Sequence, residues 1–232
     1  MPGLAQSSVW LICTLLEAAV VVCAVKSNSV RRYLCLNLYM ALSFLVSVGR
    51  YLVIHRSGVS SMEYAYFYFF SDALLTIGLY FALLNLYSLV FDEMKVEKYL
   101  RLGAVLLLGG TAWFSYAVIA QSSHRILSHF AFELSQNLYF VGLVLTYVLW
   151  GAILKLRETR TRLIQLVLGL GVYFSAFAAD YALRNLYPNL QPVWQYVTPA
   201  LGCILPAAWA FSFLWVSEDS RLAPSRLVAV PR

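Results

Sequence analysis

The stretch ALLTIGLYFALLNLYSLV, residues 73–90, has no charged side chain and is long enough to cross the hydrocarbon core of a bilayer as a helix. It is apolar along its whole length, whereas a strand of a membrane barrel alternates apolar and polar residues over about ten positions. Similar apolar runs recur along the chain. The sequence therefore predicts an all-α protein built from transmembrane helices.

The composition excludes a water-soluble globule. Of 232 residues, 61% are hydrophobic and only 12% are charged, with a mean hydropathy of +0.73. An average soluble domain is about 25% charged. The net charge of +6 does not indicate nucleic-acid binding, because the basic residues lie in the gaps between apolar runs rather than on one soluble face.

Seven apolar stretches have the length of a membrane span: residues 8–25, 34–54, 64–91, 100–121, 129–154, 162–184 and 192–216. They predict one seven-helix transmembrane domain over residues 1–216. The fourth stretch is almost wholly apolar and is expected to face lipid. Pro199 and Pro206 should kink the seventh. Residues 217–232 are polar and contain proline, so we expect a short disordered tail.

The basic residues give the bundle a direction. Thirteen of the 17 Lys and Arg residues fall on one side of the predicted membrane, in the first, third and fifth connections and the C-terminal tail. Basic residues are retained on the cytoplasmic side. The chain is therefore predicted to be a multi-pass protein of the cell membrane, with its N-terminus outside and its C-terminus in the cytoplasm.

Polar residues within the spans are the candidate ligand-binding residues, because a charge at the centre of a membrane helix costs roughly 2.5–3.5 kcal/mol. With the predicted orientation, Glu17 lies near the middle of the membrane and most of the others in its outer half. Charges of both signs among tyrosines indicate an outward-facing cavity for a small polar ligand. The candidates are Glu17, Arg50, Asp72, Glu133, Asn137, Asp180 and Arg184.

The same charges also fit a purely structural role. Asp180 and Arg184 have the spacing of an ion pair within one helix, and Arg50 could neutralise Asp72 across two helices. Pairs of this kind hold helix bundles together without binding anything.

No catalytic set, metal site or cofactor site is expected. The four cysteines, Cys13, Cys23, Cys35 and Cys203, lie in or beside apolar runs and are predicted to be buried small side chains without a disulfide. The last span contains no lysine for a retinal Schiff base. The sequence does not indicate an enzyme.

A repeated tripeptide leaves a second interpretation open. Asn-Leu-Tyr begins at Asn37, Asn85, Asn137 and Asn185, and a shift of 100 residues carries the first pair onto the second. That shift moves the second and third spans onto the fifth and sixth in opposite orientation, as in the inverted repeats of transporters.

Three functions follow from these patterns. The first is a receptor-like or sensory module that binds a small polar ligand from outside and signals through a separate cytoplasmic protein partner. The second is a small transporter or channel built on the inverted repeat. The third is a non-catalytic scaffold subunit. In each case the lipid bilayer is the main partner, and no nucleic acid is expected.

Overall fold

The computed structural model describes residues 4–58, 61–91, 97–119, 126–187, 189 and 191–221. This part of the chain folds into eight helices, and its only β-type pairing is an isolated bridge between Arg160 and Arg221. The helices are α1 (Leu4–Lys26), α2 (Leu34–Ser57), α3 (Met62–Val90), α4 (Glu97–Ile119), α5 (Ile126–Leu156), α6 (Thr161–Leu186), α7 (Gln191–Gly202) and α8 (Ile204–Trp215). The all-helical prediction is confirmed.

Six segments among the described residues are long and apolar enough to cross a membrane: Ser8–Lys26, Leu34–Ser57, Met62–Val90, Glu133–Leu156, Thr161–Arg184 and Tyr196–Trp215. Large apolar side chains such as Leu15, Val22 and Leu45 point outward and are 60–64% exposed. A water-soluble protein rarely exposes so much apolar surface. The chain is thus consistent with a membrane protein. The expected span at residues 100–121 corresponds to α4, which is not among the six.

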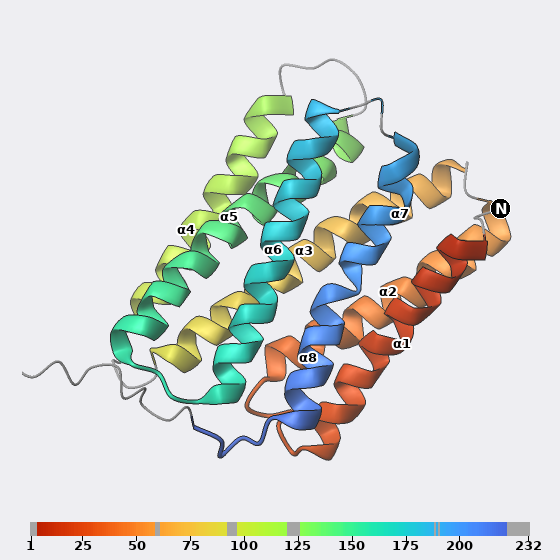
Figure 1. Cartoon of the computed structure of the whole chain (residues 1–232). Helices are drawn as coiled ribbons and strands as arrows, with labels where there is room; N and C mark the ends of the chain where they lie inside the picture. The colour runs from red at the N-terminus through yellow and green to blue at the C-terminus, as the bar shows by residue number, and fades with distance from the viewer. Residues whose placement is uncertain are drawn as a thin grey trace, which may run out of the picture.

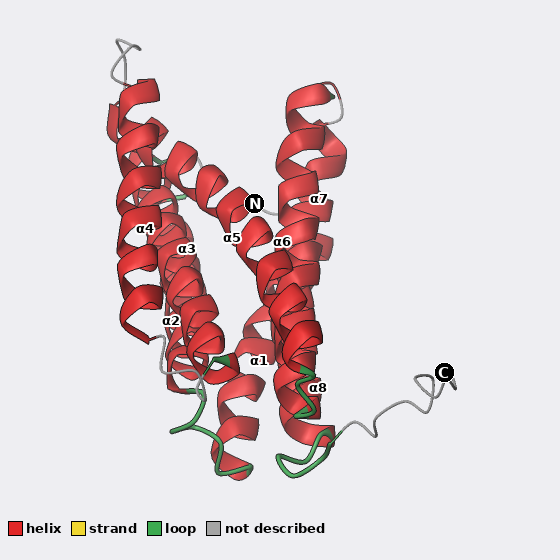
Figure 2. Cartoon of the chain, turned by 90° about the vertical axis from the view of Figure 1, so that its left-hand side faces the viewer, coloured by secondary structure: helices red, strands yellow, loops and turns green. Residues whose placement is uncertain are grey.

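The helices form one bundle, seen from the side in Figure 1, and six of them make a closed ring of contacts. In this ring α1 packs against α2, α2 against α3, α3 against α5, α5 against α6, α6 against α8, and α8 against α1. Among the described residues, helix α4 packs mainly along α5 and more weakly along α3, and it lies at one edge of the bundle in Figure 2. That position suits the apolar stretch that was expected to face lipid.

The last apolar stretch is broken as expected. Helix α7 ends at Gly202 and α8 begins at Ile204, with Cys203 between them. Pro199 and Pro206 lack backbone N–H groups, which removes hydrogen bonds on both sides of the break. The two ends of the bundle are named below after these helices, the α7 end and the α8 end.

Small residues allow close helix contacts in the ring. A Cβ atom on Gly142 of α5 would lie 2.4 Å from the ring of Phe174 on α6, and a Cβ atom on Gly169 would lie 2.9 Å from Ala208 on α8. The Trp209 indole is fully buried beside Gly169 and donates a hydrogen bond to the Leu166 carbonyl (3.1 Å). Close packing of this kind replaces the hydrophobic effect in lipid.

The packing does not reproduce the symmetry of an inverted repeat. The 100-residue shift would turn the extensive contact of α3 with α5 into an equally extensive contact of α6 with α2. Among the described residues, α2 and α6 have no such contact. The side chain of Asn185, which begins the fourth copy of the tripeptide, lies outside the part of the chain that the structure describes.

Candidate functional site

The first charge pair joins α2 to α3 near the α7 end. Arg50 Nη2 lies 3.9 Å from Asp72 Oδ1, and Arg50 Nε donates a hydrogen bond to the Ser71 hydroxyl (3.0 Å). The Arg50 guanidinium also covers the Tyr68 ring, 4.4 Å from its centroid. The side chains of Arg50 and Asp72 remain 20% and 25% exposed. Both charged side chains are therefore only partly covered by the protein.

The second pair lies within α6 and is linked to α7 by Thr198. Arg184 Nη2 lies 3.2 Å from Asp180 Oδ2, one helical turn away, as the sequence spacing suggests. Thr198 on α7 donates a hydrogen bond to Asp180 Oδ2 (3.0 Å) and accepts one from Arg184. The Asp180 carboxylate is buried, whereas Arg184 is 35% exposed. Sequence reasoning missed Thr198, because an uncharged hydroxyl in a span gives no signal of its own.

Tyrosines connect the two pairs. The Asp72 carboxylate interacts electrostatically with the hydroxyls of Tyr68 and Tyr181, and the Arg184 guanidinium interacts with the same two hydroxyls. Both pairs therefore lie within electrostatic range of the same two tyrosines, one on α3 and one on α6. We call Arg50, Asp72, Asp180, Arg184 and Thr198, with these two tyrosines, the charge cluster.

Three predicted site residues lie outside the charge cluster. Glu133 is half-buried on α5 and has no hydrogen bond or ion pair with a described residue. Asn137 lines a separate groove of about 370 Å³ between α4 and α5. Glu17 occupies a polar site of its own between α1 and α2. The structure therefore brings together Arg50, Asp72, Asp180 and Arg184 out of the seven.

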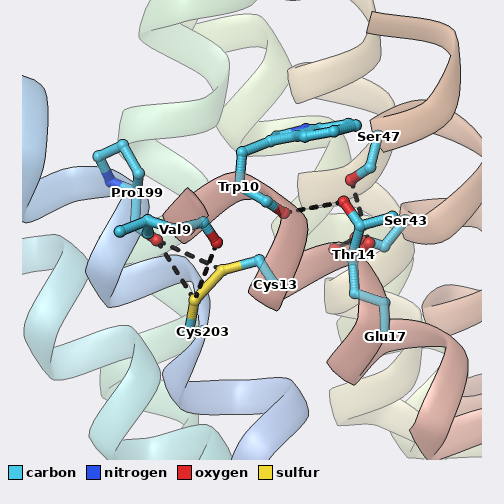
Figure 3. Close-up of a disulfide and its surroundings, with 9 residues drawn as sticks. All are labelled: Val9, Trp10, Cys13, Thr14, Glu17, Ser43, Ser47, Pro199 and Cys203. Atoms are coloured by element: carbon cyan, nitrogen blue, oxygen red, sulfur yellow. Dashed lines mark hydrogen bonds between the residues drawn. A yellow bond between two sulfur atoms is a disulfide. The ribbon is translucent and has the colours of Figure 1, made fainter. Parts of the chain in front are cut away.

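Glu17 is a buried carboxylate held by hydroxyl groups (Figure 3). Ser43 donates to Oε1 at 2.5 Å and Ser47 donates to Oε2 at 3.0 Å, both from α2. Only 9% of Glu17 is exposed. These two hydrogen bonds satisfy the carboxylate without a cation in direct contact.

One turn from Glu17, Cys13 forms a disulfide with Cys203, which corrects the prediction that all four cysteines are free (Figure 3). The Cα atoms are 4.9 Å apart, within the usual range for a disulfide. Only tertiary structure could reveal this bond, because α1 packs beside the break between α7 and α8, far away in sequence. Cys23 and Cys35 are free, as expected.

Comparison with known proteins does not identify the chain. No family model, no curated protein and no solved structure matches it. Within the described residues, no group of three His, Cys, Asp or Glu side chains is placed to hold a metal ion. The function must therefore be inferred from the geometry of the chain itself.

At the α8 end, a buried arginine joins three segments of the chain. Arg162, at the start of α6, is only 4% exposed. It donates hydrogen bonds to Ser29 Oγ in the α1–α2 connection (2.6 Å), to the Val216 carbonyl after α8 (2.8 Å) and to Glu218 Oε2 (2.8 Å). Arg32 forms a second ion pair with Glu218 (2.8 Å). We call these five residues, together with Tyr33, the Arg162 network.

The network orders residues that were expected to begin the disordered tail. Residues 217–221 lie against the α8 end, and residues 222–232 lie outside the described set. Tyr33 donates a hydrogen bond to Glu218 Oε1 (3.2 Å). Burial raises the pKa of the Tyr33 phenol, and the Glu218 carboxylate raises it further, so the phenol stays protonated as a donor. Sequence reasoning missed this network because it treated basic residues at this end only as markers of orientation.

Proposed function

We propose that the chain is a seven-span, receptor-like module of the cell membrane, with its N-terminus outside, and that α4 is the remaining span. Two features support this orientation. The thirteen basic residues that the sequence predicts on the cytoplasmic side include Lys26, Arg162 and Arg221, which lie at the α8 end. The Cys13–Cys203 disulfide lies in the half nearer the α7 end, and disulfides persist on the oxidising side of a membrane.

The ligand is a small zwitterion that binds at the charge cluster. The observation that carries this proposal is that two ion pairs, Arg50–Asp72 and Asp180–Arg184, lie near the same two tyrosines while three of the four charged side chains remain partly exposed. A ligand with a single charge would match only one of the two pairs. A zwitterion matches both, because its ammonium can bind the partly exposed Asp72 while its carboxylate binds the partly exposed Arg184.

The same helices that hold the charge cluster also hold the Arg162 network. Helix α6 carries Asp180 and Arg184 at one end and Arg162 at the other. The broken span carries Thr198 on α7, while Val216 and Glu218 follow α8. A ligand that displaces Thr198 from Asp180 would move α7 relative to α6, and the break at Cys203 allows the two halves of the span to reorient. The basic surface at the α8 end would transmit the change to a cytoplasmic protein partner.

A transporter is the alternative that a specific observation favours, because Glu17, Ser43 and Ser47 place polar groups deep between α1 and α2. Against it, the inverted repeat has no counterpart in the packing, and the Arg162 network occupies the α8 end. A scaffold subunit would contain the same ion pairs as static contacts.

A thermal-stability assay on the purified chain tests the receptor proposal. Free amino acids, glycine betaine and choline would be added in turn. A ligand at 100 times its Kd stabilises the folded state by about 2.7 kcal/mol, which raises the melting temperature by about 5–10 °C for a chain of this size. We expect this shift for at least one zwitterion and not for choline. Asp72→Asn and Arg184→Gln should abolish it, whereas Arg56→Gln, an exposed arginine near the same end, should not.

Flux measurements in proteoliposomes separate the alternatives. A receptor predicts no uptake of the stabilising compound. Uptake that is lost in Glu17→Gln would establish a transporter. If no compound stabilises the protein and Asp72→Asn simply unfolds it, the ion pairs are structural and the scaffold interpretation is correct.

A further inference from the structure

A groove of about 470 Å³ lies between α5 and α6 and shares no lining residue with the charge cluster. Small side chains of α6, at Gly171, Ser175 and Ala176, leave it hollow. Bulky side chains form its walls: Leu143, Tyr147 and Trp150 from α5, with Leu168 and Val172 from α6.

The two small hydroxyl groups in this groove are already satisfied by their own helices. Thr146 donates to the Gly142 carbonyl (2.7 Å), and Ser175 donates to the Gly171 carbonyl (2.8 Å). Both residues therefore offer mainly their carbon atoms to an occupant. The Tyr147 phenol and the Trp150 indole N–H add two polar atoms to a lining that is otherwise apolar and suits a hydrocarbon chain.

Uncompensated positive charge lies beyond the α8 end of the groove. Leu154 lies one helical turn after Trp150 and is 71% exposed. Arg157 is the first residue after the end of α5. Arg157 and Lys155 are both exposed, and neither forms an ion pair with a described carboxylate. The nearest acid in the sequence, Glu158, is neutralised by Arg160 at 2.5 Å.

The dimensions of the groove match one leaflet of a bilayer. At 1.5 Å per residue, Leu143 lies about 21 Å along the helix from Arg157. Half of a hydrocarbon core is about 15 Å, and the headgroup region adds several ångströms on each side. A chain anchored at Lys155 and Arg157 would therefore end close to the middle of the membrane, where the groove also ends.

We propose that this groove is a binding site for an anionic phospholipid of the leaflet at the α8 end. One acyl chain lies between α5 and α6, and the phosphate headgroup binds Lys155 and Arg157. Basic residues next to a membrane surface recognise anionic lipids electrostatically. The site is separate from the charge cluster and would exist in a receptor, a transporter or a scaffold alike.

Native mass spectrometry of the full chain in detergent tests the proposal. The protein would be titrated with phosphatidylglycerol and with phosphatidylcholine that carry the same acyl chains. Each basic residue near a membrane surface increases the affinity for an anionic lipid about fivefold. Two such residues therefore predict an affinity for phosphatidylglycerol roughly 30-fold higher than for phosphatidylcholine. Lys155→Gln/Arg157→Gln should remove this preference. The control Lys26→Gln/Arg31→Gln removes two exposed basic residues elsewhere at the same end and should keep it.

A second pair of variants tests the groove. Ser175→Leu fills it and should reduce the binding of both lipids, whereas Gly110→Leu fills the groove between α4 and α5 and should not. Equal binding of the two lipids by the unmodified chain would overturn the proposal, as would loss of the preference in the Lys26/Arg31 control. A dimer that dissociates on Ser175→Leu, without lipid selectivity, would show that the groove is an interface between two copies.

Discussion

The disulfide between Cys13 and Cys203 should contribute strongly to stability. The two cysteines are separated by 190 residues, and for a loop of that length the chain-entropy model gives about 5 kcal/mol. In a membrane the unfolded chain keeps its helices inserted, which restricts the loop before the bond forms. We therefore expect about 2–3 kcal/mol on reduction, at the lower end of the usual range for native disulfides.

Thermal unfolding in mild detergent, with and without a thiol reductant, measures this contribution. Two to three kcal/mol corresponds to a melting temperature lower by about 5–10 °C for a chain of this size. Cys13→Ala/Cys203→Ala should show the same decrease without reductant and should no longer respond to it. This second result separates the disulfide from any other effect of the reductant.

Counting thiols provides the refutation. Maleimide labelling of denatured, unreduced protein should modify two cysteines, Cys23 and Cys35, and reduction should raise the count to four. Four reactive thiols before reduction, or a melting temperature unchanged by reductant, would show that α1 is not covalently bound to the break between α7 and α8.

Three further substitutions test the packing, each by denaturation of the purified protein. Arg162→Met should lower the free energy of unfolding by about 3–5 kcal/mol, because it leaves the partly buried Glu218 carboxylate and the Val216 carbonyl without their donor. Arg32→Gln changes a residue of the same network that is 41% exposed, and it should lower the free energy of unfolding by under about 1 kcal/mol. Gly142→Ala should cost about 1–3 kcal/mol by overpacking, whereas Gly151→Ala on the same helix has open space for its methyl group and should be neutral or stabilising. Burial alone would raise the pKa of Glu158, but its hydrogen bonds to Arg160 outweigh burial and lower it. The ionised Glu158 therefore contributes fully to stability above its ordinary pKa of 4.5, and this contribution is lost as the pH falls through its lowered pKa. In Glu158→Gln, the free energy of unfolding should decrease less over this acidic range.

Local features of the molecule could be predicted from the sequence. The helical class follows from apolar runs whose length matches a bilayer. The pair of Asp180 with Arg184 depends only on spacing within one helix, and the kink near Cys203 depends only on the two prolines. The pair of Arg50 with Asp72 could be predicted because the spans contain few charged residues, which leaves each one few possible partners of opposite charge.

The remaining features depend on contacts between distant segments. The disulfide forms because a broken last span lies beside α1, and hydropathy contains no information about that neighbour. The Arg162 network was missed because a basic residue at a membrane boundary has two roles, one in orientation and one in packing. Its partner Glu218 was assigned to a disordered tail on composition alone. Glu133 and Asn137 lie on α5, outside the charge cluster, and Asn137 lines the groove toward α4.

Hydrogen–deuterium exchange shows most directly whether a ligand at the charge cluster alters the distant Arg162 network. The zwitterion that stabilises the protein would be added, and exchange followed in residues 27–33 and 216–221 as well as around Thr198. We expect altered exchange in all three segments, and in Arg162→Met an altered response around Thr198 alone. A ligand that binds but alters exchange only at the α7 end would contradict this prediction.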